Sequence, residues 1–206
     1  MINEVVEVMD YLSGKNISKN NIYRMCYLIA KWFKAMGLEP VKIRERIFEW
    51  ANENGLYIKQ SVNDIIHRAL TDKKKLRENV EIKISKTDIE EIEMRFDKPK
   101  TKLVALAILC YAKANADKKG EFCLSSVALG AWLGIHSSNI RRNYLRELVE
   151  FGYISKVSTP KGAFNWSHSD EENYSKYRIE VSVRNCGAFV LQNNDIKKLH
   201  KEAFFN

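Results

Sequence analysis

The chain has 206 residues, of which 45% are hydrophobic, and it carries a formal net charge of +8 at pH 7. This length fits one large or two small domains, and the apolar share is sufficient for hydrophobic cores. No apolar run reaches the roughly 18 residues that span a bilayer, and the acidic N-terminus is unlike a signal peptide, so we expect a cytoplasmic protein without a membrane partner. The four cysteines are widely scattered, which predicts reduced thiols.

The positive charge lies at both ends of the chain. Residues 1–80 hold 14 Lys and Arg against 10 Asp and Glu, residues 81–100 hold 5 against 6, and residues 101–206 hold 15 against 10. This distribution favours two charged modules over one charged tail. Together with the helical patterns below, it predicts an all-helical domain over residues 1–78, a charged linker with a short helix over 79–100, and a second domain over 101–206. A basic protein of this kind favours a polyanionic partner, although a soluble protein with a basic surface is the alternative.

Apolar residues at three- and four-residue spacing predict four helices in the first domain. The helices are expected over residues 2–12, from Asn20 or Asn21 to Gly37, from Pro40 to Gly55, and after Ser61, which forms a capping box with Asp64. These elements predict a compact helical bundle. The lysines of this bundle include Lys31, Lys34 and Lys42. They are expected to form either a second phosphate-binding surface or the solvated faces of amphipathic helices.

Residues 20–70 resemble the small helical domain near the C-terminus of plasmid and phage primases. The resemblance lies in residues 28–32 (LIAKW) before Gly37, in residues 47–52 (IFEWAN), and in the apolar spacing of residues 62–69. It implies a replication setting and either a docking role, with a protein partner for this domain, or a role close to the DNA. It implies no polymerising activity, because no primase metal carboxylates accompany it.

A short acidic helix precedes the second domain. A capping box of Thr87 and Glu90 is predicted at its N-terminus. A first long helix is predicted from Thr101 and a small strand over residues 121–124. A second helix then ends at Gly134, and Ser137 or Ser138 caps a third helix. The third helix is predicted to bury Ile140, Tyr144, Leu145, Leu148 and Val149. Two strands around a long polar loop follow, over residues 153–157 and 174–183.

Helix, turn, helix and two-stranded ribbon predict a mainly α fold with a winged helix-turn-helix. Residues 101–184 resemble winged-helix DNA-binding domains in residues 133–135 (LGI), the serine-rich turn, residues 145–148 (LREL) and residues 152–154 (GYI). The interval between Ile135 and Leu145 is one residue longer than the commonest form of that pattern. The resemblance implies that duplex DNA is the partner.

The third helix and the ribbon carry the predicted DNA-binding residues. Hydroxyl and amide groups at a helix start suit phosphate contact, and arginines one turn later reach guanine edges or the backbone. Trp166 stacks on a base or a partner, or folds back on its own strands. The predicted set is Ser137, Ser138, Asn139, Arg141, Arg142, Arg146, Lys156, Lys161, Trp166, Lys176 and Arg178.

Catalytic motifs are absent from the sequence: it has no glycine-rich phosphate loop, G-x-S-x-G, H-E-x-x-H or C-x-x-C. We therefore expect no catalytic residues, no metal and no cofactor. The predicted function is a phage- or plasmid-type DNA-binding protein in replication initiation or transcriptional regulation. The alternative is an adaptor or inhibitor that docks on a protein or nucleoprotein complex, which Trp166 and the acidic residues 170–172 favour. A last helix over residues 194–205 either covers the second domain or forms a homodimer contact.

Overall fold

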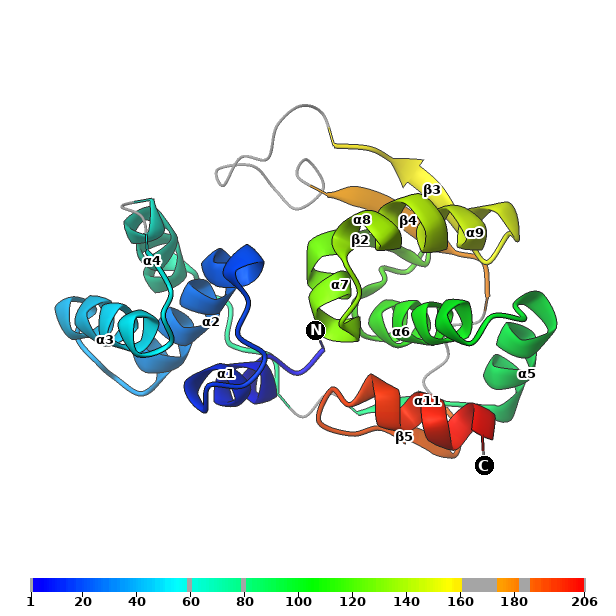
Figure 1. The fold of residues 1–206 in the computed structure, drawn as a ribbon, viewed down its shortest axis with the longest axis horizontal. Coiled ribbons are helices and arrows are strands. Elements are labelled where there is room, and N and C mark those ends of the chain that lie inside the picture. The colour runs from blue at the N-terminus through cyan, green and yellow to red at the C-terminus, as the bar shows by residue number, and fades with distance from the viewer. Residues whose placement is uncertain (1, 59–60, 79–80, 161–173, 182–185, 206) are drawn as a thin grey trace. The chain divides into compact units, whose positions relative to one another are not determined.

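The computed structural model describes residues 2–58, 61–78, 81–160, 174–181 and 186–205. The chain is mainly helical with a few short antiparallel strands (Figure 1). It divides into an N-terminal unit, Asn3–Asn79, and a C-terminal unit, which comprises Val80–Asn206 and residues 1–2. The segment predicted as a linker contributes a strand and a helix to the C-terminal unit.

The N-terminal unit is built around one central helix. Its elements are α1 Glu4–Leu12, the 3₁₀ helix η1 Lys19–Asn21, α2 Ile22–Ala35, α3 Pro40–Glu53 and α4 Val62–Thr71. Helix α2 packs against α1, α3 and α4. Its apolar side chains at three- and four-residue spacing are buried, which explains why this amphipathic sequence folds here. The indole Nε1 of Trp50 donates to the carbonyl oxygen of Tyr11 at 2.9 Å and joins α3 to α1.

A buried ion pair joins α1 to α2. The Nε and Nη2 atoms of Arg24 each lie 2.9 Å from a carboxylate oxygen of Glu7, whose side chain is buried. The hydroxyl of Tyr11 also donates to Glu7. Burial alone would raise the pKa of Glu7, but the Arg24 guanidinium and these hydrogen bonds outweigh it and lower the pKa from 4.5 to about 2.

Both predicted capping boxes are wrong in detail. Ser61 precedes α4, but its backbone is already helical, so its side chain makes no capping hydrogen bond and lies 3.3 Å from the hydroxyl of Tyr23. The second box forms two residues before the predicted one. There Ser85 accepts from the backbone of Asp88 at 3.1 Å, and Asp88 accepts from the backbone of Ser85 at 2.7 Å.

The core of the C-terminal unit surrounds helix α6, Pro99–Asn115. Helix α5 (Lys86–Arg95), helix α11 (Ile196–Phe205) and strands β1 (Ile82–Ile84) and β2 (Glu121–Leu124) all pack against it. Strand β1 pairs antiparallel with β5, Phe189–Leu191, so that Ile82 lies opposite Leu191. A Cβ atom at Gly187 would lie 2.1 Å from the carbonyl oxygen of Ile84, so only glycine permits this approach. Helix α11, which is the predicted last helix, packs on α6 and covers this part of the C-terminal unit.

The remaining elements are two helical segments joined by a short turn and a small antiparallel sheet (Figure 1). Helix α7, Ser126–Leu133, ends at Gly134, and a continuous helical segment then runs through α8 (Ser137–Asn139), the π-helical turn η2 (Ile140–Tyr144) and α9 (Leu145–Glu150). Strands β3, Ile154–Ser158, and β4, Ser175–Ile179, complete an antiparallel sheet in the order β2-β4-β3.

Two details of the predicted helix pair are wrong. The side chain of His136 caps the helical segment by accepting from the backbone of Ser138 at 3.3 Å, so Ser137 and Ser138 are its first two helical residues instead of its cap. Val149, predicted to be buried, is 38% exposed, whereas Leu145 and Leu148 of the same helix are buried.

Candidate nucleic-acid interface

The solvent face of the helical segment 137–150 carries three consecutive exposed polar residues, Arg141, Arg142 and Asn143. The flanking Ile140 and Leu145 are buried and hold the segment against the core. Among the residues that the structure describes, the side chains of these three residues have no hydrogen-bond or ion-pair partner. Two guanidinium groups and an amide are therefore available to an external ligand on one helix.

The start of this helical segment is partly occupied by an internal contact. The Nδ1 atom of His136 lies 2.7 Å from the hydroxyl oxygen of Ser138. Ser137 is half-buried and Asn139 is exposed. Of the predicted residues at the helix start, Asn139 is therefore the most accessible, and Ser138 would have to exchange a hydrogen bond to contact a phosphate.

Arg146, one turn after Arg142, pairs with an acid of its own helix. Its Nε atom lies 2.7 Å from Oε1 of Glu150, and the two side chains are 75% and 54% exposed. Exposed pairs of this kind contribute about 0.3–0.5 kcal/mol, so a phosphate can displace Glu150 at small cost. Arg146 remains a candidate contact, with its charge partly neutralised in the free protein.

The predicted basic residues of the sheet differ in their surroundings. Lys156 on β3 is exposed and has no ion-pair partner in the described part of the chain. Lys176 and Arg178 on β4 instead pair with Glu121 on β2, with Lys176 Nζ 3.0 Å from the carboxylate. Hydrogen bonds from Arg178 and Lys176 lower the pKa of Glu121, so this acid stays ionised and offsets much of their charge.

Lys161 and Trp166, both predicted to contact DNA, lie outside the described residues, as do the acidic residues 170–172.

Two exposed residues near the helix were not among the predicted contacts. Asn143 escaped notice because the prediction followed regular helical spacing, which the π turn changes. Lys197 comes from helix α11 far along the chain, and its Nζ lies 3.3 Å from the position that a Cβ of Gly134 would take. It is exposed and has no ion-pair partner within the described ranges. Local sequence contains no signal for this placement beside the helix-turn-helix.

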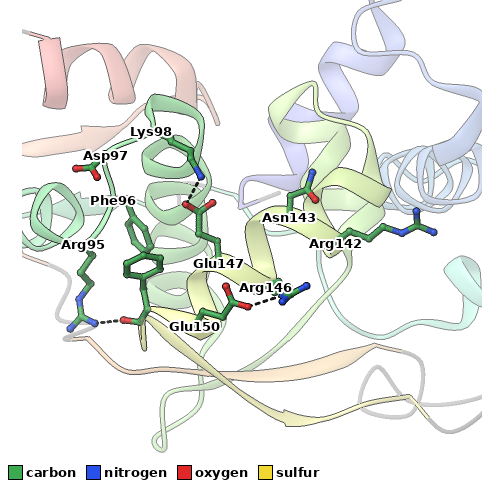
Figure 2. Close-up of a pocket in the computed structure, with 10 residues that line it drawn as sticks. Arg95, Phe96, Asp97, Lys98, Arg142, Asn143, Arg146, Glu147 and Glu150 are labelled. Carbon is green, nitrogen blue, oxygen red and sulfur yellow. Dashed lines mark hydrogen bonds and ion pairs between the residues drawn. The ribbon is translucent and has the colours of Figure 1, made fainter.

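A groove of about 510 Å³ runs beside the helical segment (Figure 2). Three of its basic residues are paired: Arg95 with Glu91 at 2.8 Å, Lys98 with Glu147 at 3.2 Å, and Arg146 with Glu150. Figure 2 shows Arg142 extending away from the carboxylates of Glu147 and Glu150. The groove is thus nearly neutral, and its rim carries one unpaired cation. It is lined by Arg95, Phe96, Asp97, Lys98, Arg142, Asn143, Arg146, Glu147, Glu150 and Phe151.

In residues 2–58, 61–78, 81–160, 174–181 and 186–205, no three His, Cys, Asp or Glu side chains gather in a way that could hold a metal ion. Within the same ranges no helix combines the length and apolar character needed to cross a membrane. Comparisons of the chain with protein-family models, curated proteins and solved structures find no match.

Proposed function

We propose that the C-terminal unit is a winged helix-turn-helix that binds duplex DNA. In this proposal the segment 137–150 enters the major groove, and strands β3 and β4 lie beside the adjacent phosphates. The observation that carries the proposal is the exposed run of Arg141, Arg142 and Asn143 with no acidic partner among the described residues. Arginine and asparagine are the side chains that pair with guanine and adenine edges.

Segment 137–150 is the proposed reading helix, and candidate phosphate contacts lie on both sides of it. Lys156 on β3 and Lys197 on α11 are exposed cations that come from different elements of the same unit. Residues 81–206 of this unit contain 20 Lys and Arg against 16 Asp and Glu, so its net charge favours a polyanion. Lys176 and Arg178 are assigned a smaller role because Glu121 already binds them.

The biological setting that we propose is a phage- or plasmid-type element, with a role in replication initiation or transcriptional regulation. The resemblance of residues 20–70 to a primase helical domain supports replication. The all-helical N-terminal unit would then contact a protein partner, in keeping with the docking role that this resemblance implies.

The test is a salt series of binding to a fluorescently labelled random-sequence duplex, measured by anisotropy with the full chain. We expect binding at low salt that weakens steeply between about 50 and 200 mM. The double variant R141A/R142A should bind roughly tenfold more weakly, and its salt slope should fall by about 1, because the phosphate contact of Arg141 is lost.

The matched control is R44A/R46A, which removes two exposed arginines from helix α3 of the N-terminal unit. It lowers the net charge equally and should leave the binding almost unchanged. Equal weakening by both double variants would show that net charge alone drives binding, and no binding by the wild-type chain at low salt would refute the proposal.

A second candidate function is docking on a protein, and the groove favours it. Phe151 on its wall is 54% exposed, and most of its charges are already paired internally. A near-neutral groove with an exposed aromatic residue suits a protein partner better than a phosphate backbone. If F151A abolished capture of a protein partner while the random-sequence duplex bound neither form, the adaptor would be the better assignment.

A further inference from the structure

The proposed reading helix is not a regular α-helix. Residues Ile140–Tyr144 form a π turn, in which the backbone N–H of Leu145 donates to the carbonyl oxygen of Ile140, five residues earlier. Such a turn accommodates one extra residue within an α-helix, and π turns occur frequently at functional sites. It accounts for the interval between Ile135 and Leu145 that is one residue longer than the commonest winged-helix pattern.

The extra residue leaves the core contacts in place on both sides of the turn. Ile140 is 0% and Leu145 is 4% exposed. At about 100° per residue, positions five apart in a regular α-helix would face directions about 140° apart, so both could not point into one core. The π turn brings them to the same side, and the surplus residue is displayed on the solvent side.

The displayed residues are Arg142 and Asn143, which both line the groove and extend in different directions from consecutive positions of the helix (Figure 2). Both are exposed, and neither side chain has a partner among the described residues. The next cation along the helix, Arg146, is held by Glu150 at 2.7 Å. The π turn thus lies within a run of three exposed residues, Arg141, Arg142 and Asn143, whose side chains have no partner among the described residues, and two of the three, Arg142 and Asn143, line the groove.

We infer that the π turn is a specificity device, and that Arg142 and Asn143 read adjacent guanine and adenine bases in the major groove. A guanidinium can pair with O6 and N7 of guanine, and a side-chain amide can pair with N6 and N7 of adenine. This inference rests on the proposed function and adds to it the base classes and the residues that select them. Arg141 and the lysines contact phosphates and carry no sequence information.

Deletion of Asn143 is the direct test. It places Ile140 and Leu145 four residues apart, which suits a regular α-helix, so the variant should keep its helical content and thermal stability. Selection from a randomised duplex library should enrich a site with adjacent G and A for the wild-type chain. The deletion variant should lose that enrichment while it retains salt-dependent binding to a random duplex, because both arginines remain.

Two substitutions keep the inference testable if the deletion variant does not fold. R142K preserves the charge but loses the bidentate geometry, and N143A removes the amide; each should reduce discrimination at one base position by roughly 5- to 100-fold. N52A, at an exposed helical asparagine of the N-terminal unit, is the control and should change nothing.

The outcomes separate the two proposals. A wild-type chain that does not bind any duplex refutes the proposed function. A wild-type chain that binds DNA without an enriched site, or variants that enrich the wild-type site with undiminished preference, refutes the inference and leaves the proposed function standing.

Discussion

The Nζ atom of Lys113 lies 2.9 Å from Oδ2 of Asp88, and the lysine side chain is completely shielded from solvent. Lys113 also donates to the carbonyl oxygen of Lys83 at 3.1 Å, while Asp88 completes the capping box of α5. One ion pair thus joins α6, β1 and the start of α5. A buried charge without its partner is costly, so this pair holds the first elements of the C-terminal unit in place.

We expect K113M to lower the free energy of unfolding by about 3–5 kcal/mol, because it leaves the Asp88 carboxylate without its buried partner. The matched control is K198M, which breaks the exposed Lys198–Glu202 pair and should cost less than about 1 kcal/mol. Urea denaturation followed by circular dichroism measures both. Similar costs for the two variants would contradict the assigned role of Lys113.

Acid should destabilise the N-terminal unit through Glu7. Its pKa of about 2 in the folded chain lies below its ordinary value of 4.5, so its contribution to stability is complete above about pH 4.5 and is lost as the pH falls through about 2. This difference corresponds to on the order of 3 kcal/mol. The wild-type advantage over E7Q should therefore shrink between neutral pH and pH 2 in urea denaturation. E53Q, at an exposed acid, should follow the wild-type curve.

The turn between α7 and segment 137–150 should not tolerate a larger residue at Gly130. A Cβ atom there would lie 2.4 Å from the carbonyl oxygen of Ile135, so the turn must move. We expect G130A to cost about 1–3 kcal/mol and to weaken DNA binding, because Arg141 and Arg142 shift with the turn. G37A has open space around its Cβ, and its strain comes instead from a backbone φ of 81°, so it should cost stability without weakening DNA binding.

Removal of single acids should show which basic surface faces DNA. E150Q removes the partner of Arg146 on segment 137–150, whereas E121Q removes the carboxylate that Lys176 and Arg178 share on the sheet. Both variants raise the net charge by one. We expect E150Q to tighten binding to a random duplex about two- to fivefold at low salt and E121Q to have a smaller effect. A larger effect of E121Q in the same anisotropy assay would move the interface to the sheet.

Much of the helical structure follows from local sequence. Apolar side chains at three- and four-residue spacing, with Pro40 at one start and Gly37 and Gly134 at two ends, place α2, α3 and α7 close to their observed bounds, and the mainly helical class is confirmed. The strands β1 and β5 could not be predicted, because three residues are too short to show alternation and each strand needs the other.

Some features of the candidate site also follow from the sequence, and others depend on the tertiary structure. The sequence by itself determined that arginines follow a helix-turn-helix pattern and that one residue is in excess, since both can be counted along the chain. Only the tertiary structure decided that a π turn absorbs the excess and exposes Asn143, because burial of Ile140 and Leu145 in one core selects that backbone. It also decided which charges are free, since Glu121 reaches Lys176 and Arg178 only when β2 pairs with β4.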